Sequence, residues 1–293
     1  MTLPYSLSLH LPLNADLHCH SNLSDGTLTP EILAARAKAN GVELWALTDH
    51  DEVAGVERAA NAARSLALPF LTGVELSVSF ADETVHIVAL GVDIQNADLL
   101  EGMKKTRSGR LKRAQRMGDE LAKAGIRGAY EGALKYVDNP ETISRTHFAR
   151  FLVEAGVCRS NIEVFRKYLN RGKPGYVAHG WAALGECMEW IRSAGGMAVI
   201  AHPGRYKRLS ATAEHALFTE FCALGGQGVE VVTGSHSPAD AIKYAQIAKD
   251  FGLLASRGSD FHAPSESRID LGALPLLDST LEPVWGHLAG CIQ

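Results

Sequence analysis

The stretch Ala15–Pro30, ADLHCHSNLSDGTLTP, joins a short apolar segment, a group of metal-binding side chains and the start of a helix. His18 and His20 stand two residues apart, so on an extended strand both side chains point to the same face. Asp25 follows in a loop, and Pro30 suits the first position of a helix. The stretch therefore predicts a strand that ends in metal ligands and is followed by a helix, the repeating unit of an α/β fold.

The same order of strand and helix recurs along the chain. Further runs rich in Val, Ile and Leu are ELWALTDH (43–50), PFLTGVELSV (69–78), TVHIVALGVD (84–93), MAVIAHP (197–203), GVEVVTG (228–234) and LLASRGSDFH (253–262). Helical patterns follow most of these runs, at residues 30–40, 52–66, 181–194 and 238–251. Strands that alternate with helices predict a parallel sheet with helices outside, and seven strands favour a barrel over an open sheet.

The fourth and fifth predicted strands are separated by about a hundred residues, far more than a crossover needs. Most of that gap has a helical pattern, and residues 101–180 hold 17 Lys and Arg against 8 Asp and Glu. The rest of the chain holds 12 against 25. We therefore predict a barrel of residues 1–100 and 179–293 with a basic helical insertion at 101–178. The insertion is either a lid that attracts an anionic substrate or an ordinary solvated helical surface.

Whole-chain properties exclude several classes of protein. The 293 residues carry a net charge of −4, without the basic excess of a nucleic-acid-binding domain. No apolar run approaches the roughly 20 residues that span a bilayer, and the first residues lack the charged start and apolar stretch of a signal peptide. The five cysteines form no CxxC pair. We expect a reduced, cytoplasmic protein that needs neither a membrane nor an obligate protein partner.

Metal-binding residues stand at or near the end of every predicted strand, where barrels gather their reactive groups. The nine candidates are His18, His20, Asp25, His50, Glu75, His86, His202, Asp260 and His262. A set of imidazoles and carboxylates without thiolates suits Mn, Zn, Fe or Co in a catalytic site and disfavours a structural zinc site. Nine ligands, one of them a bridging carboxylate, would serve two or three metal ions. We interpret the isolated His10, His179, His215 and His287 as ordinary polar residues.

These motifs resemble those of the PHP (polymerase and histidinol phosphatase) superfamily over nearly the whole chain. They are DLHCHSNLSDG (16–26), TDHD (48–51), GVELS (73–77), VHIVALG (85–91), AHPGR (201–205) and GSDFH (258–262). The insertion, with ISRTHFARFL (143–152) and NRGKPGYV (170–177), resembles the stand-alone bacterial 3′,5′-nucleotide bisphosphate phosphatases and 5′–3′ exoribonucleases. It looks less like the histidinol phosphatases or the polymerase-attached domains.

The resemblance implies a distorted, TIM-like (β/α)7 barrel with a trinuclear metal centre, and manganese is the expected metal. By motif, the first metal would take His18, His20, Glu75 and Asp260; Glu75 would bridge to a second metal held by His86 and His202; Asp25, His50 and His262 would hold the third. Some relatives have histidine where this chain has Asp25. Aspartate is also a competent ligand, although the exchange can change the preferred metal.

The implied reaction removes the 3′-phosphate of nucleoside 3′,5′-bisphosphates to give 5′-nucleotides. Degradation of short 5′-phosphorylated RNA from its 5′ end is a second activity of the subgroup. We expect a metal-bridged hydroxide to attack phosphorus, with Glu75 as the bridging carboxylate. Arg145, His147 and Arg205 are candidate substrate contacts. His236 is a substrate contact, the proton donor to the leaving oxygen or a structural residue.

Three other interpretations remain open at this point. An amidohydrolase-like barrel also begins with HxH, but it usually has a carboxylated lysine as the bridge, and the third strand offers Glu75 and no lysine. A histidinol-phosphatase-like phosphomonoesterase would keep the same metals with another substrate. A non-catalytic RNA-binding or metal-binding PHP module is the third interpretation, and the complete ligand set favours an enzyme over it.

Overall fold

The computed structural model describes residues 13–293, so His10 lies outside the described residues. An eight-stranded sheet forms its centre. Seven strands follow one another in the order β1 (Ala15–Asp16), β2 (Leu44–Leu47), β3 (Phe70–Phe80), β4 (Glu83–Leu90), β6 (Met197–Ile200), β7 (Gly228–Thr233) and β8 (Leu254–Gly258). The two-residue strand β5 (Ala182–Ala183) pairs with β3 beside this path.

The two ends of this sheet meet directly after β1 and β8. The N–H of Leu17 donates to the carbonyl of Arg257 at 3.0 Å, and the N–H of Asp260 donates to the carbonyl of His18 at 2.8 Å. The sheet therefore curls into a nearly closed barrel of seven strands. The predicted distorted (β/α)7 barrel is confirmed.

Strand β4 departs from the prediction of a wholly parallel sheet. It pairs antiparallel with both β3 and β6. Ala81 and Asp82 alone separate it from β3, both with positive φ, and so short a link allows a hairpin but no crossover. Because β4 runs in the opposite direction, His86 near its start lies at the same barrel edge as the carboxyl ends of the other strands. Its carbonyl accepts the N–H of Ala201 at 3.0 Å.

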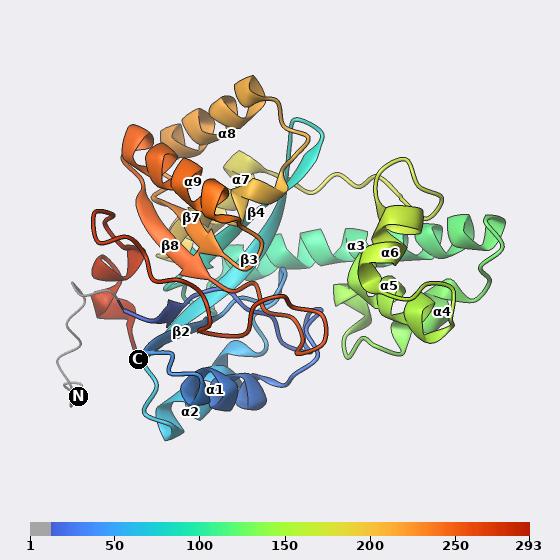
Figure 1. The fold of residues 1–293 in the computed structure, drawn as a ribbon, viewed down its shortest axis with the longest axis horizontal. Coiled ribbons are helices and arrows are strands. Elements are labelled where there is room, and N and C mark those ends of the chain that lie inside the picture. The colour runs from blue at the N-terminus through green and yellow to red at the C-terminus, as the bar shows by residue number, and fades with distance from the viewer. Residues whose placement is uncertain (1–12) are drawn as a thin grey trace.

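Five helices pack around the barrel: α1 (Pro30–Ala39), α2 (Val56–Ser65), α7 (Leu184–Ser193), α8 (Ala211–Ala223) and α9 (Pro238–Phe251) (Figure 1). Four of them match predicted helical patterns, and α8 was not predicted. Helix α2 begins four residues later than expected, because the Glu52 carboxylate accepts the N–H groups of Val53 and Ala54 and holds them in a turn.

The long crossover between β4 and β6 is helical, as predicted. It holds α3 (Ala97–Lys123), α4 (Ala129–Leu134), α5 (Arg145–Glu154), α6 (Asn161–Val164) and a π-helical turn at Phe165–Leu169. Figure 1 shows α4, α5 and α6 beside the far half of α3, away from the sheet. Short 3₁₀ turns lie at Pro140–Thr142, Pro203–Arg205, Val284–Gly286 and Ala289–Cys291. None of the helices within residues 13–293 is long and apolar enough to cross a membrane.

Two hydrophobic cores hold the structure together, and α3 contributes to both. Leu99 and Met103, in its first half, pack in the barrel core. Met117 and Leu121, in its second half, pack in a smaller core made by residues 114–177. We call residues 111–178 the helical unit. The predicted boundary at residue 101 falls inside a continuous helix, so the division into barrel and insertion remains a prediction.

Candidate metal centre

Nine side chains lie together at the barrel edge where the parallel strands end. They are the nine predicted ligands, His18, His20, Asp25, His50, Glu75, His86, His202, Asp260 and His262. They form overlapping groups of three or four, and in each group one ligand atom per residue lies within 4.8 Å of all the others. The barrel therefore brings together residues that lie up to 244 positions apart in the sequence.

Glu75 stands at the centre of the cluster. It is fully buried on β3. Its Oε1 lies 2.9 Å from both His86 Nδ1 and His202 Nε2 and 3.3 Å from His18 Nε2, and its Oε2 lies 2.8 Å from His50 Nδ1. Burial would raise the pKa of this carboxyl group, but the His50, His86 and His18 rings hold it well below its usual range. The two oxygens of Glu75 thus contact different parts of the cluster.

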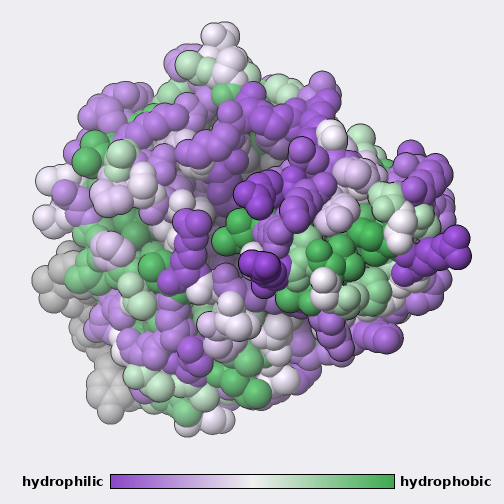
Figure 2. Space-filling model, turned by 45° about the vertical axis from the view of Figure 1, so that its right-hand side comes forward, coloured by the Kyte–Doolittle hydropathy of each residue, from purple (hydrophilic) through white to green (hydrophobic). Residues whose placement is uncertain are grey.

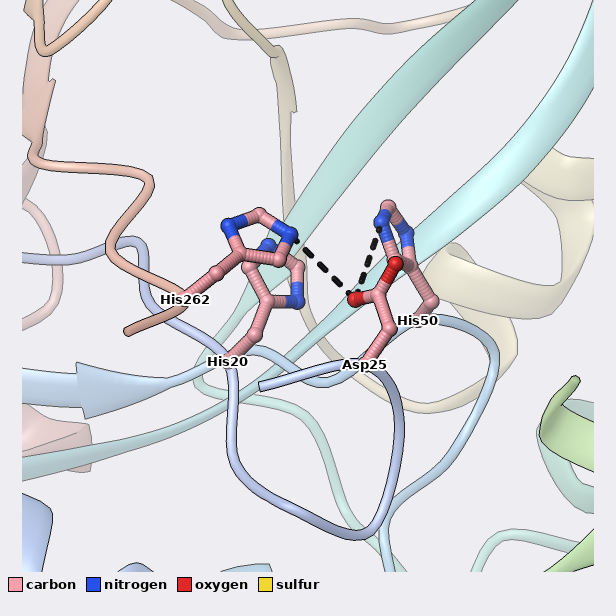
Figure 3. Close-up of side chains that lie close together, drawn as sticks. All are labelled: His20, Asp25, His50 and His262. Carbon is pink, nitrogen blue, oxygen red and sulfur yellow. Dashed lines mark ion pairs between the residues drawn. The ribbon is translucent and has the colours of Figure 1, made fainter. Parts of the chain in front are cut away.

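A second part of the cluster, which we call the Asp25 sub-site, comprises His20, Asp25, His50 and His262 (Figure 3). Asp25 Oδ1 lies 3.2 Å from His262 Nε2 and 3.8 Å from His50 Nε2. The His20 and His262 rings stack with their centroids 4.1 Å apart. Burial alone would lower the pKa of His262, but the Asp25 and Asp260 carboxylates raise it to about 9. The sub-site thus joins loops that follow β1, β2 and β8.

The third part of the cluster depends on unusual backbone geometry. His18 and His20, on one face as predicted, approach to 3.2 Å between their Nε2 atoms, and Asp260 Oδ1 lies 3.2 Å from His20 Nε2. Asp260 and His202 both have positive φ, 54° and 28°, which is rare for residues other than glycine. Such strain concentrates at functional sites, where the surrounding structure holds it. Arg205 Nη1 lies 2.5 Å from Asp260 Oδ2.

The donor set fits divalent cations. Among the described residues, the buried Asp25 Oδ1, His50 Nδ1 and Glu75 Oε2 form no well-aligned hydrogen bond, although each lies within 3.2 Å of another polar atom of the cluster. Burying polar atoms without partners is costly, and a bound cation would satisfy them together. Imidazole nitrogens and carboxylate oxygens suit Mn, Zn, Fe or Co, so the set indicates metal ions without selecting one of them.

Two acidic residues that the sequence analysis missed support the ligands from behind. Glu230, buried on β7, accepts the Nδ1–H of His18 at 2.7 Å and the main-chain N–H of His202 at 2.6 Å. Asp49 accepts the N–H of Ser21 at 2.7 Å and so fixes the loop after His20. Outer partners of this kind orient metal ligands. In the sequence, Glu230 is indicated only as the one charged residue in the apolar run GVEVVTG.

Helix α3 contacts the site through Asp51, which follows the candidate ligand His50. The Asp51 carboxylate accepts the N–H of Ser77 at 2.8 Å and pairs with the buried Arg110. Arg107 donates to the Asp51 carbonyl at 2.6 Å. Burial would raise the pKa of Asp51, but the Arg110 guanidinium lowers it. The barrel edge that holds His50 is thus braced by the helix that leads into the helical unit.

A cavity of about 420 Å³ extends from the candidate ligands His86 and His202 towards the helical unit. Figure 2 shows hydrophilic side chains around the hollow between the barrel and the helical unit. Its cationic lining residues are Arg113, Arg145, Arg171, Arg205, Lys207 and Arg208, and its aromatic ones include Phe165, Tyr176 and Trp181. The metal cluster therefore opens into a strongly cationic pocket with aromatic faces.

Arg113 and Arg145 are the two partly buried cations of the pocket, and neither forms an ion pair within residues 13–293. Arg171 also forms none there, but it is exposed and donates to the carbonyl of Asp82 at 3.1 Å. Arg113 donates through Nε to the carbonyl of Val177 at 3.0 Å. Arg145 stands over the Phe165 ring at 5.7 Å. Burial and then the charge of Arg145 lower the pKa of Arg113 to about 9. Burial and then the charge of Arg205 lower the pKa of Arg145. Cations crowded together in this way favour the binding of an anion.

Two of the three predicted substrate contacts line the cavity, Arg145 and Arg205. His147 does not. It is fully buried, and its Nδ1 accepts the N–H of Ser144 at 2.9 Å, which caps the start of α5. His179, interpreted from the sequence as an ordinary polar residue, does line the cavity, with its ring centroid 4.3 Å from that of Trp181. Nothing in the spacing of these residues indicated which of them would reach the cavity.

His236 contacts the main chain around the turn that carries Arg205, and its predicted role remains untested. Its Nε2 accepts the N–H of Gly204 at 3.0 Å, and its Nδ1 donates to the carbonyl of Val231 at 2.9 Å. Its ring stacks on Tyr244 with centroids 4.9 Å apart. It does not line the cavity, and both ring nitrogens are engaged with the main chain. It supports the turn that carries Arg205.

Comparisons with known proteins agree with this geometry. A model of the PHP domain matches residues 16–139. The 3′,5′-nucleoside bisphosphate phosphatase of Chromobacterium violaceum is 52% identical over 94% of this chain and 96% of its own length. The 5′-3′ exoribonuclease Rnm of Escherichia coli is 41% identical over 92% of each chain.

A solved structure is similar to this chain along nearly its whole length. It is that of a Chromobacterium violaceum protein described as an amidohydrolase with bound sulfate and no metal. It has a TM-score of 0.92 and 52% identity, and it covers 96% of this chain and 97% of its own. With the barrel, the clustered ligands and relatives that match along almost their whole length, the chain belongs to the PHP domain family.

Proposed function

We propose that this protein is a metal-dependent phosphoesterase that hydrolyses the 3′-phosphate of nucleoside 3′,5′-bisphosphates to give 5′-nucleotides. We propose that it also releases 5′-nucleotides from short 5′-phosphorylated RNA. The observation that carries the proposal is the cationic cavity, because it joins two candidate metal ligands, His86 and His202, to the unpaired Arg113 and Arg145. A substrate with two phosphates fits such a pair of sites.

The substrate class is supported by the relatives. One relative is named a 3′,5′-nucleoside bisphosphate phosphatase and another a 5′-3′ exoribonuclease, and both match this chain along almost its full length. The two substrates share a nucleotide that bears a 5′-phosphate and an esterified 3′-phosphate. One site that binds the first phosphate and hydrolyses at the second would accept either of them.

Within the proposal, the nine clustered side chains hold two or three divalent cations, with manganese as the expected metal and Zn, Fe or Co as competent substitutes. Such cations supply Lewis acidity that activates water near neutral pH and neutralises phosphate oxygens. Glu75, whose two oxygens contact different parts of the cluster, would be the bridging ligand. Its carboxylate stays ionised because the surrounding imidazoles lower its pKa.

The reaction balances as a hydrolysis. The oxygen of water bonds to phosphorus, the P–O3′ bond breaks, and the 3′ oxygen leaves as a hydroxyl group after taking up a proton. A nucleoside bisphosphate then yields a 5′-nucleotide and inorganic phosphate. RNA yields a 5′-nucleotide and a chain one residue shorter that keeps a 5′-phosphate and can react again.

The residues of the cavity would bind and orient the substrate. Arg205 lines the cavity and contacts the ligand Asp260, so its guanidinium can stabilise charge on the phosphate that reacts. Arg113 and Arg145 would bind the 5′-phosphate, for which the planar fork of arginine is well suited. The aromatic faces of Trp181 and the other cavity residues offer a stacking surface for the base.

The test is phosphate release from adenosine 3′,5′-bisphosphate by manganese-loaded protein, with identification of the nucleotide product. We expect AMP with its 5′-phosphate retained, and loss of the reaction in Glu75→Gln, which keeps the shape of the side chain. Histidinol phosphate and an amide substrate serve as comparison substrates. Turnover of either of these above the bisphosphate would replace the proposal with another member of the same superfamily or with an amidohydrolase activity.

RNA must be tested separately from the mononucleotide. Short RNA with a 5′-phosphate should release 5′-nucleotides one at a time, and the same RNA with a 5′-hydroxyl should react much more slowly. Tight binding of RNA without hydrolysis of any phosphate ester would favour a binding module. Equal rates on the RNA with a 5′-phosphate and on the RNA with a 5′-hydroxyl would contradict the proposed 5′-phosphate site.

A further inference from the structure

The helical unit reaches the metal cluster at one ligand, Asp25. Ser144 Oγ, at the start of α5, donates to Asp25 Oδ2 at 2.9 Å. Arg150 Nη2, further along α5, donates to the main-chain carbonyl of Asp25 at 2.7 Å. The other carboxylate oxygen, Oδ1, lies 3.2 Å from His262 Nε2. One helix thus holds Asp25 by its side chain and by its main chain and leaves the second oxygen directed at the cluster.

Arg150 is itself held in a fixed orientation. Its side chain is 8% exposed, and its guanidinium forms a bidentate pair with Glu266, with both N···O distances at 2.8 Å. Glu266 lies four residues after the ligand His262. A bidentate pair restricts the guanidinium in both distance and plane. The same side chain therefore connects α5 to the two loops that carry Asp25 and His262.

The barrel holds the main chain of the Asp25 loop but not its carboxylate. Asp49 accepts hydrogen bonds from the N–H of Ser21 and from Ser24 Oγ, at 2.7 and 2.6 Å. A Cβ at Gly26 would lie 2.1 Å from a main-chain oxygen, so the loop is closely packed there. Among the described residues, Ser144 is the one side chain outside the cluster that donates to the Asp25 carboxylate.

We infer that Arg150 and Ser144 are positioning residues, and that the Asp25 sub-site binds its cation fully only when α5 is docked on the barrel. The inference rests on the proposed function, because it takes the side chains of the sub-site as cation ligands. Loss of an outer partner of a metal ligand typically weakens metal binding about 10- to 100-fold. The effect is confined to one sub-site, since Glu75, His86 and His202 are positioned by barrel strands and their ends.

The start of α5 also connects the sub-site to the substrate cavity. Ser144 contacts Asp25, and the next residue, Arg145, lines the cavity. A displacement of α5 would therefore move a ligand of the metal cluster and a proposed phosphate contact together. The helical unit is in this sense part of the metal site as well as a cover for the substrate.

The experiment measures bound Mn²⁺ per chain and the dissociation constant of each ion, by metal analysis at fixed free Mn²⁺ and by electron paramagnetic resonance. Full-length wild type, Arg150→Met and Ser144→Ala are compared. Arg127→Met is the matched control, because Arg127 is an exposed arginine of the same helical unit with no hydrogen bond or ion pair to another side chain within residues 13–293. Methionine keeps the apolar length of the arginine stem.

We expect Arg150→Met to lower the affinity for one Mn²⁺ ion about 10- to 100-fold. The affinities for the other ions should stay within twofold of wild type. Ser144→Ala should lower the affinity for the same ion by a smaller factor, and Arg127→Met should lower the affinity for none of them. Affinities in Arg150→Met equal to those in Arg127→Met would overturn the inference and leave the proposed function standing. Failure of wild type to bind any divalent cation would overturn both.

The variant Glu266→Gln distinguishes the positioning of Asp25 by Arg150 from the docking of α5 on the barrel. This variant loses the charge of the pair between α5 and the barrel, while Arg150 keeps its hydrogen bond to the Asp25 carbonyl. We expect it to lower the melting temperature of the metal-free protein as much as Arg150→Met does, and to weaken Mn²⁺ binding less. A loss of Mn²⁺ affinity as large as that of Arg150→Met would show that docking alone matters and would contradict the positioning role.

Discussion

His18 Nδ1 lies 2.7 Å from Glu230 Oε1, a carboxylate that is 1% exposed in the middle of strand β7. The contact makes Nδ1 the protonated ring nitrogen and leaves Nε2 to face the cluster, 3.3 Å from Glu75 Oε1. Glu230 also accepts the main-chain N–H of His202 at 2.6 Å. One buried carboxylate thus sets the orientation of two candidate metal ligands that come from different strands.

Glu230→Gln should therefore weaken metal binding without removing a ligand. Glutamine can present its amide nitrogen to His18, which disfavours the tautomer that directs Nε2 at the cluster. We expect metal affinity to fall about 10- to 100-fold, as for other outer partners of metal ligands. Titration of the metal-free protein with Mn²⁺, followed by calorimetry, measures the change. Unchanged affinity would mean that the strand backbone alone orients His18.

Glu75→Gln should have a larger effect, because five imidazoles lie within 3.3 Å of the Glu75 carboxylate oxygens. The substitution removes the central negative charge of the cluster while it keeps the size of the side chain. We expect metal affinity to fall by more than the about 10- to 100-fold that loss of an outer partner costs. Phosphate release should fall with it. Metal content and initial rates are measured on the same samples. Phosphate release that persists in Glu75→Gln after the metal is lost would contradict a bridging role.

The variants Arg113→Met and Arg145→Met should lose activity on substrates with two phosphates and keep it on substrates with one. A charge-assisted hydrogen bond contributes about 1.5–3 kcal/mol, so kcat/KM for a nucleoside 3′,5′-bisphosphate should fall about 10- to 100-fold in each variant. Hydrolysis of p-nitrophenyl phosphate, which carries a single phosphate, should change little. Arg127→Met is again the control. An equal loss on both substrates would place these arginines at the reacting phosphate instead.

The nine clustered residues could be predicted from the sequence because each lies at or near the end of a recognisable strand. The HxH pair and the DFH pair occupy alternate positions on extended chain, and the carboxyl ends of parallel strands meet at one edge. His86 was correctly expected in the cluster although β4 runs against the other strands. The direction of β4 depended on a two-residue hairpin turn at Ala81 and Asp82, which the search for alternating strands and helices overlooked.

The supporting contacts could not be predicted, because they join residues whose spacing in the sequence carries no periodic signal. Glu230 lies 212 positions after His18, and Arg110 lies 59 positions after Asp51. Whether a histidine reaches the cavity is also decided by tertiary packing. His147 turns its ring to cap its own helix, whereas His179 packs beside Trp181 in the cavity wall. Only the three-dimensional arrangement assigns these roles.

A pair of glycines allows a test of how α3 is attached to the barrel. Gly102 of α3 packs against α7, and a Cβ at this position would lie 2.3 Å from Trp190 Cδ2. Gly102→Ala should destabilise the protein by about 1–3 kcal/mol, because overpacking outweighs the gain in helix propensity. At Gly185 of α7 the nearest atom would be Leu224 Cδ2 at 4.0 Å, so Gly185→Ala should stabilise by about 0.5–1 kcal/mol. Urea unfolding of the metal-free proteins measures both changes. The two substitutions should change the free energy of unfolding in opposite directions. A stabilising Gly102→Ala would mean that α3 packs less closely on α7 than this structure shows.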